Sequence, residues 1–94
     1  IISSNVPEKF SLGQNYPNPF NPATNIEFSI FHSELTKLVV YDALGREIVT
    51  LVNSELKPGI YKAEWDASKY NSGVYFYKLS SGGFTETKKM ILVK

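Results

Sequence analysis

Few side chains in this chain of 94 residues could catalyse a reaction or hold a metal, because it has one histidine and no cysteine. That histidine, His32, precedes Ser33 and Glu34, and a nucleophile–base pair built on it would need a serine and a carboxylate brought close by folding. The three residues form a short polar break, which is typical of a solvated turn. No loop of alternating aspartates suggests a calcium site. We therefore predict neither a nucleophilic site nor a metal site.

Paired carboxylates are a second possible chemistry, since two of them can hydrolyse a glycosidic bond. The candidates are Asp42, Glu64 and Asp66. Asp42 and Asp66 each follow directly after an apolar segment, where an aspartate commonly accepts hydrogen bonds from turn amides. We therefore expect a protein that is not an enzyme and that carries no cofactor.

Aromatic side chains could instead stack on sugar rings, as they do in a carbohydrate-binding module. The residues available for such a platform are Trp65, Tyr70, Tyr75, Phe76 and Tyr77. Trp65 shares one side of a predicted strand with Tyr61 and Ala63, which favours a core position. Tyr75 and Tyr77 alternate with apolar neighbours, as expected where both faces of a strand are covered. Core packing is thus favoured, and sugar binding stays as an alternative.

Alternation with a period of two predicts the strands that would position these residues. It is clearest at residues 24–31, where Ile26, Phe28 and Ile30 face one way. Five more strands are predicted at residues 36–41, 46–52, 60–65, 74–79 and 84–93, with a connection at residues 53–58. Turn signals separate them, and no helical period occurs. The pattern predicts an all-β, immunoglobulin-like sandwich of antiparallel strands, with a closed barrel as the alternative.

A proline-rich stretch, residues 15–22, precedes the first regular strand and holds three of the five prolines. Proline fixes φ and removes a backbone donor, so this stretch can be neither helix nor central strand. We expect a stiff, extended lead-in along the domain, with Tyr16 and Phe20 buried. Residues 1–9 are interpreted as a linker from a preceding domain, and residues 10–94 as one domain.

The charge is balanced, with ten basic and nine acidic residues and a net charge of +1. Neither nucleic-acid binding nor a polybasic membrane patch is indicated. No apolar run is long enough for a transmembrane segment, and no export leader is recognisable. We expect the chain to be a piece of a longer protein. Lys94 would then be a free carboxyl terminus, with Lys88 and Lys89 close before it, although solvated lysines on an ordinary terminal strand explain the pattern as well.

Four groups of residues, taken in order, carry a family resemblance. They are residues 12–24 (LGQNYPNPFNPAT), residues 40–48 (VYDALGREI), the elements GIY at 59–61 and SGVY at 72–75, and residues 88–94 (KKMILVK). With them, residues 10–94 resemble the type A C-terminal sorting domain of the type IX secretion system, also described as the Por secretion system sorting domain family. The resemblance implies a sandwich of seven strands at the carboxyl end of an exported protein of the Bacteroidetes and their relatives.

The resemblance also implies a function and its residues. Such a domain directs a fused, folded cargo from the periplasm through the outer-membrane translocon to the cell surface or medium. A sortase-like peptidase then removes the domain, here within residues 1–9, and some cargoes are attached to surface lipopolysaccharide. Recognition by the translocon is expected at Lys88, Lys89, Met90 and Lys94. The residues expected to hold or present this strand are Asn18, Pro19, Phe20, Asn21 and Pro22 and the turn at Gly45 and Arg46. Further motif residues with an expected structural role are Asp42, Gly59, Tyr61, Gly73 and Tyr75.

The physical basis for such a label is that a folded cargo can be recognised only at its surface. A terminal strand with an exposed edge would let a receptor add a strand of its own. Besides the carbohydrate-binding alternative, a purely structural immunoglobulin-like module stays open, since the chain more distantly resembles the one in flagellar hook-capping proteins.

Overall fold

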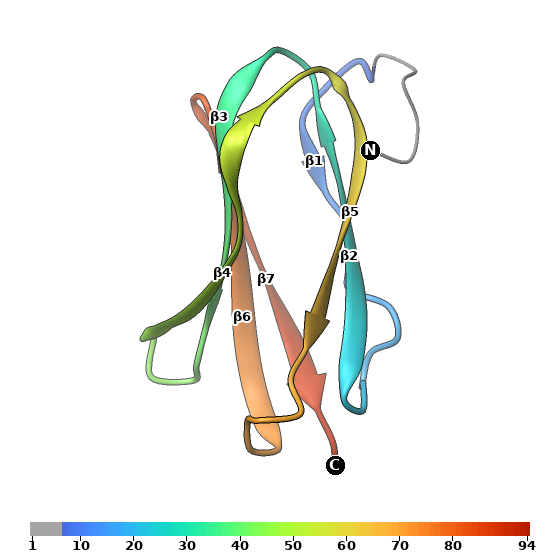
Figure 1. Cartoon of the computed structure of the whole chain (residues 1–94), viewed down its shortest axis with the longest axis vertical. Coiled ribbons are helices and arrows are strands. Elements are labelled where there is room, and N and C mark those ends of the chain that lie inside the picture. Colours follow the sequence, from blue (N-terminus) through green and yellow to red (C-terminus); the bar gives the residue numbers. More distant parts are fainter. Residues whose placement is uncertain (1–6) are drawn as a thin grey trace.

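A computed structural model describes residues 7–94, in which seven strands form two sheets. The strands are β1 (Ser11–Leu12), β2 (Ala23–Ile30), β3 (Glu34–Tyr41), β4 (Glu47–Leu56), β5 (Gly59–Asp66), β6 (Gly73–Ser81) and β7 (Phe84–Leu92). One sheet has the order β1-β2-β5 and the other β4-β3-β6-β7, with every neighbouring pair antiparallel. The two sheets lie face to face (Figure 1). This confirms the predicted all-β sandwich and excludes a closed barrel.

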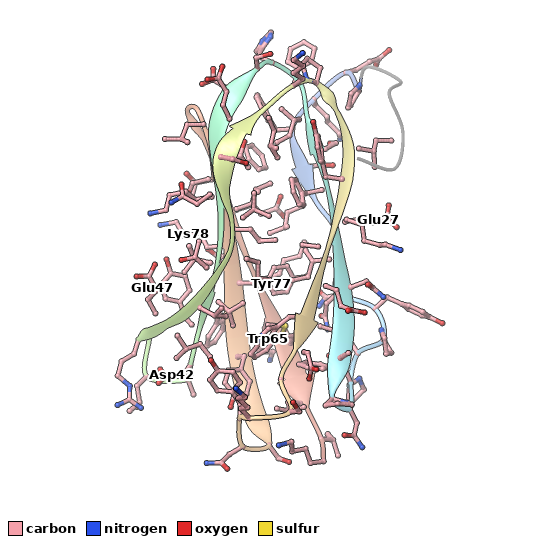
Figure 2. All side chains as sticks on the ribbon, viewed as in Figure 1. Glu27, Asp42, Glu47, Trp65, Tyr77 and Lys78 are labelled. Carbon is pink, nitrogen blue, oxygen red and sulfur yellow. The ribbon has the colours of Figure 1, made fainter. Side chains whose placement is uncertain are left out.

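The core lies between the sheets because each strand turns alternate residues inward. Ile26, Phe28 and Ile30 of β2 are buried as predicted, each at most 2% exposed. Tyr77 and Trp65 point between the sheets, whereas Lys78 and Glu47 point away from the four-stranded sheet (Figure 2). The core cluster consists of Leu12, Phe20, Ile26, Phe28, Ile30, Leu38, Val40, Trp65, Ala67, Tyr75, Tyr77, Leu79, Met90 and Leu92.

Four of the five aromatic residues considered for a sugar platform pack in or against this core: Trp65, Tyr75 and Tyr77 belong to it, and Tyr70 packs against it. Phe76 alone points to the outer face of β6. The Trp65 ring lies 5.3 Å from that of Tyr75 and 5.5 Å from that of Tyr70, between ring centroids. Trp65 and Tyr77 are 3% and 0% exposed. Buried rings cannot stack on a sugar, so the platform interpretation is wrong and the core interpretation is confirmed.

Strand β4 is longer than predicted. It runs to Leu56, so the connection expected at residues 53–58 shrinks to Lys57 and Pro58. The prediction failed because β4 is an edge strand whose end is polar and exposed, as at Asn53 opposite Lys37. Two shifts of register between β3 and β4 also break the alternation on which the prediction depended.

The lead-in lies along the domain, as predicted, but its backbone forms more hydrogen bonds with the strands than expected. Ser11 and Leu12 form β1 against β2, and farther on Tyr16 exchanges two backbone hydrogen bonds with Asn25, of 2.9 and 2.8 Å. Phe20 is buried as predicted. Tyr16 is 78% exposed, so its predicted burial is wrong. Alternation explains this, because the neighbouring Asn15 takes the inward position.

Candidate functional site

Strand β7 carries most of the residues predicted for recognition, and it lies at one edge of the four-stranded sheet. Met90 and Leu92 turn into the core, at 0% and 1% exposed. Lys89 and Ile91 therefore point to the opposite, solvent side. Lys88 has the same parity as Met90 and is half-buried. The two neighbouring lysines thus point to opposite faces of one sheet.

The three lysines predicted for recognition have separate electrostatic surroundings. Lys88 Nζ lies 3.4 Å from a carboxylate oxygen of Glu86 on the same strand. Lys94 Nζ donates to the Ser68 carbonyl oxygen at 2.6 Å, which ties this side chain to the loop between β5 and β6. Lys89 forms no ion pair within residues 7–94. Along an extended strand Lys88 and Lys94 lie about 20 Å apart, so the structure does not bring these charges together.

Met90 has a different kind of position from the lysines. Its side chain is fully buried, and its cross-strand partner is Tyr75 of β6. A receptor cannot touch the Met90 side chain while the domain is folded. Met90 can therefore affect recognition only by fixing how β7 sits on the core.

The free edge of β7 is covered over part of its length by the lead-in. Phe20 donates its N–H to the Ile91 carbonyl at 3.0 Å and accepts the Val93 N–H at 3.0 Å. Asn18 Oδ1 accepts the Ile91 N–H at 3.1 Å, and Gln14 Nε2 donates to the Lys89 carbonyl at 2.8 Å. We call Gln14, Asn18 and Phe20, where they bind residues 89–93, the terminal clamp.

The terminal clamp is itself anchored in the core. The Phe20 ring is 2% exposed, with its centroid 5.7 Å from that of Trp65. Upstream, Asn15 donates from Nδ2 to Thr24 Oγ1 at 3.0 Å and to the Pro17 carbonyl at 3.1 Å. These contacts fix the loop before it reaches β7. The prediction of an open terminal edge is therefore wrong from the Lys89 carbonyl to the Val93 N–H, because the lead-in binds the Lys89 carbonyl, both backbone groups of Ile91 and the Val93 N–H.

A buried tyrosine completes the anchoring of the lead-in. Tyr77 of β6 donates its hydroxyl hydrogen to the Gly13 carbonyl at 2.7 Å and accepts the Asn15 N–H at 2.8 Å. Burial raises the pKa of Tyr77 to about 12. Sequence reasoning placed Tyr77 in the core but missed this role, although a buried tyrosine hydroxyl usually has a hydrogen-bond partner. Gln14 and Asn15 were missed as well, and no local pattern indicates their distant partners.

The motif at residues 42–46 is a hydrogen-bonded turn between β3 and β4. Asp42 Oδ1 accepts the N–H groups of Leu44 and Arg46, both at 2.9 Å, and Arg46 Nε donates to Asp42 Oδ2 at 2.7 Å. The Arg46 N–H is the main cause that lowers the pKa of Asp42 below its ordinary value. Gly45 has φ 83°, a conformation that favours glycine. Asp42 therefore acts as a turn acceptor, not as a catalytic carboxylate.

The two Gly-x-Tyr elements have one structural role in common. The Tyr61 hydroxyl donates to the Lys57 carbonyl at 2.7 Å, and the Tyr75 hydroxyl donates to the Asn71 carbonyl at 2.6 Å. Each tyrosine thus binds the carbonyl four residues upstream and fixes the turn that enters its strand, as a tyrosine corner does in immunoglobulin-like domains. Gly59 and Gly73 begin the strands β5 and β6.

The remaining motif residues lie on the surface of the lead-in. Pro19, Asn21 and Pro22 are exposed, and the Pro22 carbonyl accepts the Ala67 N–H at 2.8 Å. His32 is exposed in the turn between β2 and β3. Within residues 7–94 no group of three or more potential metal-binding side chains occurs, and no helix is long and apolar enough to cross a membrane.

A comparison with models of protein families identifies the family of this chain. The family model of the secretion system C-terminal sorting domain matches residues 14–94, which contain the terminal clamp, the turn at residues 42–46, both Gly-x-Tyr elements and β7. No curated protein matches the chain. Since the family model covers most of the chain, the chain belongs to the secretion system C-terminal sorting domain family, and it is a non-catalytic type IX sorting domain that directs the secretion of a cargo protein.

Proposed function

We propose that this domain is carried by a folded cargo at its amino-terminal side and that the outer-membrane type IX translocon recognises it as a folded surface from the periplasm. The observation that supports this most is the fixed position of residues 89–92, which pair with β6 on one side and lie against the terminal clamp on the other. A strand held on both sides presents its outward side chains in one arrangement. Such an arrangement suits recognition without unfolding.

The residues that we assign to recognition are those of the terminal strand. Lys89 is exposed on the outer face, and Lys94 is held by the Ser68 carbonyl and, through its N–H, by Ser72 Oγ at 2.9 Å. Lys88 contributes from the opposite face of the sheet. Met90 acts from within the core by setting the position of its neighbours.

We further propose that a sortase-like peptidase cuts the linker at residues 1–9 and that the cargo reaches the cell surface or the medium. Residues 1–6 lie outside the described residues. Lys9 lies next to β1, and its carbonyl accepts a hydrogen bond from Ser29 Oγ at 3.0 Å. Regular pairing begins at Ser11, which is compatible with a boundary near residue 10.

The first test is an export assay of a folded reporter fused to the whole chain in a host with a type IX system. We expect the reporter outside the cell, with an intact mass that ends within residues 1–9. A reporter that stays in the periplasm would contradict the sorting role. A product outside the cell that still contains Lys94 would contradict removal by a peptidase.

The second test concerns the lysines. Replacement of Lys88, Lys89 and Lys94 by Gln should reduce export while the melting temperature stays within a few degrees, because exposed substitutions change stability by no more than about 0.5 kcal/mol each. The matched control replaces Lys37, Lys57 and Lys62, which are exposed elsewhere, and removes the same charge. Normal export of the first variant would show that these lysines are not the signal.

A further inference from the structure

The outer face of β6 and β7 combines apolar and basic side chains that do not pack in the core. We call it the outer patch and define it as Val74, Phe76, Lys78, Lys89 and Ile91. These side chains are neighbours because the strand register places Val74 opposite Ile91 and Phe76 opposite Lys89. Figure 2 shows Lys78 on the side of the four-stranded sheet that faces away from the other sheet.

The outer patch contains apolar side chains at positions that face solvent. Val74 and Ile91 are each 36% exposed, and directly opposite residues on antiparallel strands have their Cβ atoms about 4.5–5.5 Å apart. Phe76 is half-buried beside them. Single exposed apolar residues are common, but an apolar group on two adjacent strands is more typical of a contact surface.

The charge of the outer patch has one sign. The other outward positions of β6 and β7 are Ser80, Thr85 and Thr87, so these strands place no carboxylate beside Lys78 or Lys89. Within residues 7–94 neither lysine forms an ion pair. Lys88, on the opposite face, has Glu86 as its partner. The same face of the sheet also carries Glu47, but on β4, two strands away from β6. Two lysines without an ion pair therefore lie beside the exposed apolar group.

A hollow adjoins the outer patch at Val74. It has a volume of about 200 Å³ and lies between the turn at residues 42–46 and the start of β6. Leu44 lines it and is 79% exposed, and Val74 belongs to both the hollow and the outer patch. Asp42 and Arg46 also line it, but they pair with each other at 2.7 Å. An apolar side chain could thus enter the hollow while the segment that carries it crosses the patch.

We propose that the outer patch binds an acidic protein segment of the export machinery, with carboxylates at Lys78 and Lys89 and an apolar side chain in the hollow beside Val74. The assignment rests on the proposed function and names the chemistry of its partner. Complementary charge speeds the encounter and selects the partner, and the apolar contact prolongs the complex. Lys88 lies on the opposite face of the sheet and has no part in this contact.

The test is the export assay described above, with two double variants that remove equal charge. Lys78→Gln with Lys89→Gln should reduce the rate of export on the order of tenfold, which corresponds to about 1.4 kcal/mol. Lys57→Gln with Lys62→Gln, which are exposed away from β6 and β7 and leave the outer patch intact, should change the rate less than about twofold. Both variants should melt within a few degrees of the parent. Equal export of the two variants would overturn the proposal, whereas failure of the unmodified fusion would instead count against the sorting role.

A second measurement identifies the occupant. Since the chain has no cysteine, Thr87→Cys labels the outer patch uniquely with a photo-crosslinker, and Glu64→Cys labels the other sheet as a control. We expect an adduct with a translocon component from Thr87→Cys only, and its loss when Lys78 and Lys89 are Gln. An adduct between two copies of this chain, or an adduct with lipid, would overturn the assignment to an acidic protein segment.

Discussion

The contact between Asn18 and the backbone of Ile91 can be tested separately from the rest of the terminal clamp. Asn18→Ala removes the Oδ1 atom that accepts the Ile91 N–H at 3.1 Å. It leaves the two backbone hydrogen bonds between Phe20 and β7 in place, and the Phe20 ring stays in the core. The change should therefore loosen the edge of the terminal strand without unfolding the lead-in.

The size of the effect follows from the loss of one partly solvated hydrogen bond, which contributes about 1 kcal/mol to the free energy of unfolding. For a domain of this size, 1 kcal/mol corresponds to a fall of about 4–8 °C in the melting temperature. The Ile91 amide should also exchange with solvent about fivefold faster, because 1 kcal/mol changes an opening equilibrium by that factor.

The assay combines thermal unfolding, followed by circular dichroism, with amide hydrogen exchange resolved by NMR. Asn21→Ala is the matched control, because Asn21 lies in the same loop, is exposed and has no side-chain hydrogen bond to a described residue. We expect it to melt within about 0.5 kcal/mol of the parent domain, as surface substitutions usually do. It should leave the exchange of the Ile91 amide unchanged.

Two results would refute this reasoning. If Asn18→Ala melts at the temperature of the parent domain and leaves the exchange of the Ile91 amide unchanged, the side-chain contact does not stabilise β7. If both variants lose the same stability and the same protection, the effect comes from the conformation of the loop and not from the Asn18 hydrogen bond.

Four further predictions concern the core and the turns. Tyr77→Phe leaves the Gly13 carbonyl and the Asn15 N–H without their partner, so urea unfolding should show a loss of about 2–4 kcal/mol, and an unchanged midpoint would contradict it. Because burial raises the Tyr77 pKa from 10.0 to about 12, the unfolded chain loses this proton first. Stability should therefore hold below pH 10 and fall between pH 10 and 12, and urea titrations of Tyr77→Phe should lack this fall. Met90→Ala should lower the free energy of unfolding by about 2–5 kcal/mol, because it leaves a cavity in the core. Gly45→Ala should lower it by about 1–2 kcal/mol, because alanine is strained at a φ of 83°. Thermal unfolding measures both changes.

The sequence was sufficient to predict the fold wherever one strand face is buried and the other is not. In β2 the inward residues Ile26, Phe28 and Ile30 alternate with the polar Asn25, Glu27 and Ser29, so the alternation is unambiguous. At β4 the same reasoning failed because an edge strand with shifted register no longer alternates. The opposite orientations of Lys88 and Lys89 follow from parity alone.

The terminal clamp could not be predicted in the same way. Its partners, Asn18 and Ile91, lie 73 residues apart, and nothing near either one indicates the other. Local reasoning treated Tyr16 and Phe20 alike as aromatic residues that needed burial. Which of them enters the core depends on where the lead-in meets β2 and β7, and this is a property of the assembled sandwich.

The terminal clamp can form only after both of its segments have been synthesised. The ribosome makes residues 14–20 before residues 89–93, and the hydrogen bonds between the two segments need both. Closure of this long loop must wait until the last strand has emerged and paired with β6. A chain in which β7 is missing or unfolded therefore cannot form the terminal clamp, and under the recognition proposed above only molecules with a folded β7 are exported.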